Sequence, residues 1–188
     1  MRICGGAFRG RKLALFRGRA LRPTPEHIRE AVFNILGQDM QDVDVLDLFA
    51  GTGVLGLEAL SRGASNAVFV DKSPQAITII KENIKNLMVQ NRVHVVRYDL
   101  TRGLTPLGKV NGDFKLVFLD PPYGKDMAKM VLQKLDRWPR LDQGSIVVVE
   151  HFEKELIQLL FQSLELREKR SYGQTAISIF EKTRVASG

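Results

Sequence analysis

Hydrophobic and polar positions change their spacing near residue 43, and this change divides the chain. From there to residue 150, short apolar runs alternate with segments whose apolar side chains recur every three or four positions. The runs predict strands at 43–49, 66–71, 92–99, 114–120 and 144–150. Runs so uniformly apolar are typical of parallel strands that are buried on both faces and covered by helices.

The segments between these runs predict helices. A glycine at its end, Gly63, terminates the helix predicted at 53–63. Ser73 and Pro74 cap and open another helix. The buried side of that helix is formed by Ile77, Ile80, Ile84 and Leu87. Further helices are expected near 126–137 and 152–162.

The two ends of the chain follow other patterns. Residues 164–173 and 174–182 predict two strands joined by a tight turn, which make an antiparallel hairpin at the sheet's edge. Near the start, β-like pieces separated by glycines predict a hairpin or small ribbon within 2–16. A helix follows, which Thr24 caps and Pro25 opens.

The expected fold is therefore α/β and doubly wound, of the Rossmann-like type. It has a seven-stranded, mostly parallel sheet that ends in an antiparallel C-terminal hairpin, and a small basic β-extension precedes it. We expect the extension to comprise residues 1–38 and the domain that contains the sheet to comprise residues 39–188.

Composition narrows the class of protein. With 188 residues and 44% hydrophobic content, the chain is long enough for one well-packed core. No apolar run approaches the length that crosses a bilayer, and no apolar signal region follows the basic start, so we expect a cytoplasmic protein. The single cysteine, Cys4, fits a reducing compartment. We expect no metal site, because His27, His94 and His151 lie far apart without ligand spacing.

Positive charge is concentrated near the start of the chain. Of the formal net charge of +7, residues 1–38 carry +6, from seven arginines and one lysine against two glutamates. Basic side chains that bind phosphates release counterions and so supply affinity for a nucleic acid, whatever its nucleotide sequence. The guanidinium group of arginine suits two phosphate oxygens at once. A merely solvated basic surface is the alternative. The arginine content favours a nucleic acid as the partner.

A glycine-rich turn follows the first predicted strand of the sheet. Gly51, Gly53 and Gly56 have the dinucleotide-binding spacing, and Asp71 ends the next strand, 20 positions after Gly51. At that place an acid can accept both hydroxyls of an adenosine ribose. The motif alone leaves nicotinamide, flavin and S-adenosylmethionine cofactors open, as well as a turn without a ligand.

The charge of Asp47 distinguishes between these candidate cofactors. A carboxylate just before the glycine turn repels a pyrophosphate, whereas it attracts a cationic ammonium or sulfonium. S-adenosylmethionine has both cationic groups and no phosphate, so we expect it as the cofactor. Asp99 ends the third strand, where it either accepts from the adenine amino group or is an ordinary solvated acid.

The fourth strand ends abruptly in Asp120, Pro121, Pro122 and Tyr123. The two prolines remove two N–H groups and leave carbonyl acceptors, and an ionised aspartate is also acceptor-only. Such a stiff patch of acceptors beside an aromatic ring complements an amino group on a flat base. The alternative is a turn that simply ends the strand.

With this motif, nearly the whole chain resembles the bacterial RsmD-type family, which methylates N2 of a guanine in small-subunit ribosomal RNA. The matching pieces are at 2–13, 22–36, 45–64, 69–73, 118–123, 147–152 and 172–180. The resemblance implies a class I S-adenosylmethionine-dependent methyltransferase fold, with the catalytic domain at 39–188.

The resemblance also implies roles for individual residues. The cofactor would be held by Asp47, Phe49, Ala50, Gly51, Thr52, Gly53, Asp71, Lys72, Asp99 and Leu100. The target amine would be received by Asp120, Pro121, Pro122 and Tyr123. The RNA would be bound by Arg9, Arg11, Lys12, Arg17, Arg22 and Thr24.

The function expected is methyl transfer from S-adenosylmethionine to a guanine N2 in 16S ribosomal RNA. The partner would be the RNA itself or a partly assembled small subunit, and we expect a monomer. Three alternatives stay open: an adenine-N6 methyltransferase of DNA or RNA, a nicotinamide-dependent oxidoreductase, and a catalytically silent RNA-binding module. Between adenine and guanine, the residues alone do not decide.

Overall fold

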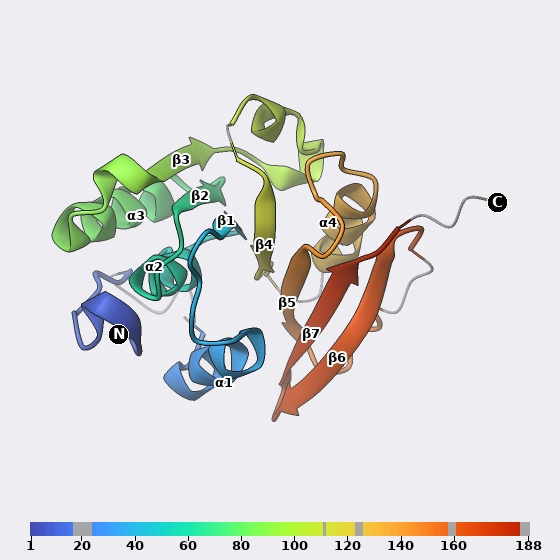
Figure 1. Cartoon of the computed structure of the whole chain (residues 1–188), viewed down its shortest axis with the longest axis horizontal. Helices are drawn as coiled ribbons and strands as arrows, with labels where there is room; N and C mark the ends of the chain where they lie inside the picture. The colour runs from blue at the N-terminus through green and yellow to red at the C-terminus, as the bar shows by residue number, and fades with distance from the viewer. Residues whose placement is uncertain (17–23, 111, 123–125, 158–160, 185–188) are drawn as a thin grey trace.

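Seven strands form one sheet, in the order β3-β2-β1-β4-β5-β7-β6 (Figure 1). The structure is a computed structural model that describes residues 1–16, 24–110, 112–122, 126–157 and 161–184. The strands are β1 Asp44–Leu48, β2 Asn66–Asp71, β3 Val93–Arg97, β4 Phe114–Leu119, β5 Ile146–Phe152, β6 Leu164–Tyr172 and β7 Thr175–Lys182. The first five pair in parallel, and β7 is antiparallel to both β5 and β6. The expected sheet and its C-terminal hairpin are confirmed.

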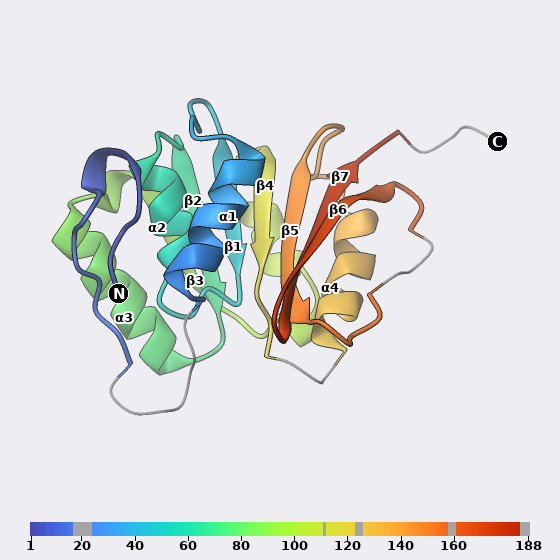
Figure 2. The ribbon, with the colours of Figure 1, turned by 90° about the horizontal axis from the view of Figure 1, so that it is seen from below.

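The α-helices of the described residues cover the two faces of the sheet (Figure 2). They are α1 Glu26–Leu36, α2 Val54–Ser61, α3 Pro74–Leu87 and α4 Met127–Asp136. Short 3-10 turns lie at Gly6–Phe8, Gln90–Arg92, Leu100–Arg102 and Thr105–Lys109. One core contains α1, α2 and α3, and the other contains α4. Alternate strand residues feed the two cores: Phe118 belongs to the first, and Val117 and Leu119 belong to the second.

Two expected helix starts have different outcomes. Ser73 caps α3 as expected, since its hydroxyl accepts a hydrogen bond from the backbone N–H of Ala76 at 3.3 Å. The prediction that Thr24 caps α1 is wrong. Pro25 is the N-cap residue of α1, and the Thr24 hydroxyl instead donates to a carboxylate 126 positions away, that of Glu150.

The helix expected near 152–162 is absent from the described part of that segment, which is 152–157 and 161–162. Strand β5 continues to Phe152, because His151 and Phe152 pair with Ala176 and Thr175 of β7. The backbone N–H of Glu153 extends this pairing to the Gln174 carbonyl at 2.8 Å. Pairing with a segment that comes later in the chain thus keeps residues 152 and 153 extended, where the helix is expected to begin. Among the described residues, no helix is long and apolar enough to span a membrane.

The segment 1–16 lies against α2 and α3 and has the expected antiparallel pairing only as a single bridge, between Arg2 and Lys12. Its apolar side chains Ile3 and Leu13 are buried in the same core as α1 and α2. The division at residue 38 stays a prediction, although the described part of the extension shares a core with the sheet.

A fully buried acid on α2, Glu58, holds this segment in place. Its carboxylate accepts from the backbone N–H groups of Cys4 at 2.8 Å and Gly5 at 2.7 Å. The same carboxylate forms an ion pair with Arg62 at 2.8 Å, one helical turn on. Because every charge and donor here is paired, burial of the acid is compensated.

Replacing Glu58 with alanine leaves the buried Arg62 guanidinium and two backbone donors without their acceptor. We expect Glu58→Ala to lower the free energy of unfolding by roughly 3–5 kcal/mol, measured by urea denaturation. Glu82→Ala, at an exposed position on α3, is the matched control and should change it by less than about 0.5 kcal/mol. Equal effects of the two substitutions would contradict the anchoring role of Glu58.

Candidate active site

Three carboxylates lie close together at the C-terminal ends of the parallel strands, because these strands end on the same side of the sheet. Asp120 follows Leu119 of β4, and Glu150 follows Val149 of β5, its register partner. Asp47 of β1 is in register with Phe118, two residues before Asp120. Since side chains alternate along a strand, these acids all lie on the face of the sheet that α1 and α2 cover.

The hydroxyl of Thr24 joins two of these acids. Its oxygen lies 2.9 Å from Oε2 of Glu150 and 3.4 Å from Oδ2 of Asp120. Asp120 is partly exposed at this site, yet the surrounding atoms exclude most water from it. This desolvation, and then the charges of Glu150 and Asp47, raise the pKa of Asp120 well above its ordinary value.

The third acid, Asp47, is almost completely buried. Its Oδ2 accepts a hydrogen bond from the backbone N–H of Gly56 at 3.0 Å. Burial raises the pKa of Asp47 to about 8, the Gly56 hydrogen bond opposes this shift, and Asp71 adds to it. A buried acid with a raised pKa is stabilised as a carboxylate when a cationic group binds beside it.

The glycine turn between β1 and α2 is held by the expected acid. Oδ2 of Asp71 accepts from the backbone N–H of Gly51 at 2.9 Å, and its Oδ1 accepts from Ser73 at 2.8 Å. A carboxylate has about four acceptor positions, so Asp71 can hold the turn and still accept from a ligand. Gly56 is required for packing, because a Cβ there would lie 2.5 Å from the Phe69 ring.

A cavity of about 670 Å³ opens beside these groups, a volume in the ordinary range of small-molecule sites. The residues expected at the site that line it are Thr24, Asp47, Phe49, Ala50, Gly51, Thr52, Asp71, Lys72, Asp120, Pro121 and Pro122. The structure therefore brings most of the expected cofactor and target residues to one cavity.

Of the other expected site residues, those that the structure describes are not among the residues that line the cavity. Gly53 is the N-cap of α2, and Leu100 is buried in the second core. Asp99 is linked to the cavity rim by Lys72, whose Nζ lies 3.8 Å from its Oδ2. Hydrogen bonds from Thr101 lower the pKa of Asp99. Arg9, Arg11 and Lys12 are exposed on the N-terminal segment, whereas Tyr123, Arg17 and Arg22 fall outside the described residues.

Comparison with known proteins identifies the family. The model of the family described as conserved hypothetical protein 95 matches residues 1–181. The chain belongs to this family. The membership confirms the RsmD-type resemblance, since relatives named ribosomal RNA small subunit methyltransferase D match along most of their length.

Three relatives of this family member show how far the similarity extends. YlbH from Bacillus subtilis is 36% identical over 97% of this chain and 99% of its own. Ribosomal RNA small subunit methyltransferase D from Escherichia coli K12 is 29% identical over 97% of this chain and 90% of its own. The solved structure of yhhF from Escherichia coli has a TM-score of 0.84 and 27% identity, covering 97% of this chain and 98% of that one. The fold is that of class I methyltransferases, as expected.

Sequence reasoning missed several residues that line the cavity of this family member: Leu15, Phe16, Glu150, Phe152, Gln174 and Thr175. Glu150 had a signal, because it ends a predicted apolar strand in the way that Asp71 and Asp120 do. Gln174 and Thr175 reach the cavity through the turn between β6 and β7, which is placed by the pairing of β7 with β5.

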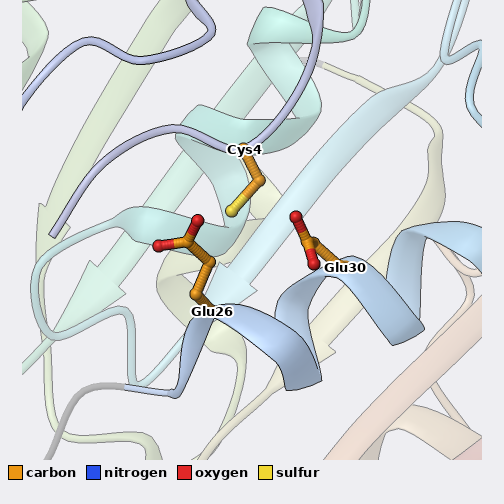
Figure 3. A group of neighbouring side chains, drawn as sticks. All are labelled: Cys4, Glu26 and Glu30. Carbon is orange, nitrogen blue, oxygen red and sulfur yellow. The ribbon is translucent and has the colours of Figure 1, made fainter.

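A second group of potential ligands lies away from the cavity. Sγ of Cys4 and carboxylate oxygens of Glu26 and Glu30 lie within 4.8 Å of one another (Figure 3). The Arg29 guanidinium donates to the same sulfur at 3.0 Å, and burial raises the pKa of the Cys4 thiol. Metal binding requires a thiolate, so a raised pKa and a neighbouring cation make this group a poor metal site.

The raised pKa of Asp47 makes the stability of the ligand-free protein depend on pH. The native protein keeps a proton that the unfolded chain releases above about pH 4, so the free energy of unfolding should fall as pH rises from about 4 to about 8. Asp47→Asn should reduce this slope by at most about 1.4 kcal/mol per pH unit. Urea denaturation at several pH values measures it.

The control for this experiment is Asp113→Asn, which changes an exposed aspartate. It should leave the slope as in the unsubstituted protein, because an exposed acid has similar surroundings in the folded and unfolded chain. Equal slopes for Asp47→Asn and the unsubstituted protein would contradict the titration of Asp47.

Proposed function

We propose that this chain transfers a methyl group from S-adenosylmethionine to the exocyclic N2 amine of a guanine in small-subunit ribosomal RNA. Family membership and the name of the Escherichia coli relative support the reaction and the substrate. The observation that carries it is the position of Asp120, Pro121 and Pro122 on the wall of the same cavity as the glycine turn.

The residues around the turn fit S-adenosylmethionine better than a dinucleotide. Asp47 is buried beside the turn and would repel a pyrophosphate, but it suits the cofactor's ammonium group. Asp71 lines the cavity and would accept from the ribose hydroxyls. When bound, the cofactor supplies an electrophilic methyl group on a sulfonium.

Asp120 and the proline carbonyls would orient the amine and increase the electron density on its nitrogen. The nitrogen lone pair is delocalised into the base, so accepted hydrogen bonds and exact placement supply most of the catalysis. As the N–C bond forms, the bond between the methyl carbon and the sulfonium sulfur would break. The sulfur would leave as a neutral thioether, and the positive charge would pass to the nitrogen. The nitrogen then loses a proton, which the Asp120 carboxylate or water accepts. The base must leave its stack to reach the cavity.

The N-terminal segment would bind the RNA backbone from a fixed position. Arg9, Arg11 and Lys12 are exposed on it. Besides Glu58, the buried side chain of Asn83 on α3 holds this segment, through bonds of 2.6 and 3.2 Å to Ala14. A segment held at both places presents its charges to phosphates in a constant geometry. We further propose that the protein acts as a cytoplasmic monomer on the RNA or a partly assembled subunit.

Replacing Asp120 with alanine should remove the acceptor for the amine but leave the glycine turn intact. We expect Asp120→Ala to lower the rate of transfer by about 100- to 1,000-fold, measured as methyl incorporation into small-subunit RNA and into isolated subunits. Binding of S-adenosylmethionine, measured by calorimetry, should change by less than about threefold. Asp142→Ala, at an exposed position, is the control. Full activity in Asp120→Ala would refute the assigned role.

Replacing Arg9, Arg11 and Lys12 together with alanine should weaken RNA binding and make it less dependent on salt. The slope of log affinity against log salt concentration should fall in magnitude by about 2. Filter binding at salt concentrations from about 50 to about 300 mM measures this slope. The control removes three basic residues from β6: Arg167, Lys169 and Arg170. An equal loss of slope in both triple variants would contradict a specific role for the N-terminal segment.

A further inference from the structure

Glu150 is the acid of the cavity that the reaction described above does not use. It lies on β5, and Asp120 directly follows the neighbouring strand β4. Figure 1 shows β4 and β5 side by side. Its residue surface is 7% exposed, and it lines the cavity. A carboxylate so deeply placed is costly unless it has hydrogen-bond donors around it. The hydroxyl of Thr24 is one of these donors, and its oxygen lies 2.9 Å from Oε2 of Glu150.

The wall that Glu150 shares with Asp120 is rich in acceptors. Both carboxylates reach the same Thr24 hydroxyl. That hydroxyl has one hydrogen, and its shorter contact is with Glu150. Pro121 and Pro122, which continue the wall, have no backbone N–H. A ligand that faces this wall is therefore selected for neighbouring hydrogen-bond donors.

The purine bases differ in this respect. Guanine has two neighbouring donors on one edge, the N1–H group and the N2 amine. Adenine has an N6 amine next to N1, which bears a lone pair and no hydrogen. 2-Aminopurine keeps the N2 amine of guanine but has the adenine-like N1. A carboxylate opposite N1 accepts from guanine, whereas it meets a lone pair in the other two bases, and two acceptors that face each other in a buried site repel.

We propose that Glu150 is a specificity-determining residue, which accepts the N1–H of the target guanine while Asp120 accepts from its N2 amine. This role rests on the proposed function and deepens it, because it supplies the choice between guanine and adenine. The nearby charge of Glu150 contributes to the raised pKa of Asp120. Two adjacent donors of a guanine offset the repulsion between the two acids, so the bound base favours the ionised form of both.

The test compares two bases at the target position. The methylated guanine is first mapped by mass spectrometry of the product RNA. Ribosomal RNA ligated from two pieces then carries either guanine or 2-aminopurine at that position. Methyl incorporation from labelled S-adenosylmethionine gives kcat/KM for each RNA with the unsubstituted protein, Glu150→Gln and the control Glu153→Gln. Glu153 lies three residues further on and is not among the cavity-lining residues of the described chain.

The unsubstituted protein and Glu153→Gln should prefer guanine over 2-aminopurine by about 10- to 100-fold. In Glu150→Gln the preference should fall by about tenfold or more, because the amide can donate to the N1 lone pair. Each protein is measured with both RNAs, and the preference for guanine is compared between the proteins. This comparison separates the contact between Glu150 and N1 from other differences between the bases. Thermal melting and S-adenosylmethionine titration verify that Glu150→Gln is folded.

Each outcome decides a separate question. No transfer to guanine by the unsubstituted protein, either in the RNA or in a partly assembled subunit that contains it, would overturn the proposed function itself. Transfer to guanine with an unchanged preference in a folded Glu150→Gln would overturn only the role of Glu150. Equal transfer to both bases by the unsubstituted protein would overturn that role without any variant.

Discussion

The register between neighbouring parallel strands is the constraint on which the site depends. β1 and β4 are buried on both faces, so a shift of one residue would move every side chain to the opposite core. The same register brings Asp120 and Glu150 to adjacent places at the sheet's edge. Packing of apolar residues along the strands thus determines where carboxylates meet at their ends, although the carboxylates contribute little to that packing.

The site also depends on a set of hydrogen bonds that hold the N-terminal segment against the sheet domain. Glu58 accepts from the backbone of residues 4 and 5, and Asn83 binds Ala14. Asn83 also donates to the Thr52 carbonyl in the glycine turn, at 3.0 Å. One buried amide therefore connects the basic segment to the expected cofactor site, and the positions of the two are coupled.

Much of the fold follows from local patterns, and the remainder depends on partners distant in sequence. The apolar runs predict strands β1 to β5, and Ser73 caps α3, because both depend on near neighbours. Thr24 has the chemistry of a cap but bonds to Glu150 instead. The helix is expected to begin at residue 152, yet pairing with β7 keeps Phe152 in strand β5. Asp47, Asp71 and Asp120 follow from motifs. Glu150 ends an apolar run that has no such motif, and its place beside Asp120 depends on the pairing of β5 with β4.

The buried guanidinium of Arg29 has a consequence for the order in which the protein can assemble. It donates to the Arg2 carbonyl at 2.7 Å and the Thr24 carbonyl at 3.1 Å. Thr24 in turn depends on Glu150. A ribosome synthesises Glu150 long after Arg29, so a nascent chain has the arginine before the acid that completes the site. The part of the cavity wall that Glu150 forms therefore requires β5, which must be synthesised and must join the sheet beside β4 before the wall is complete.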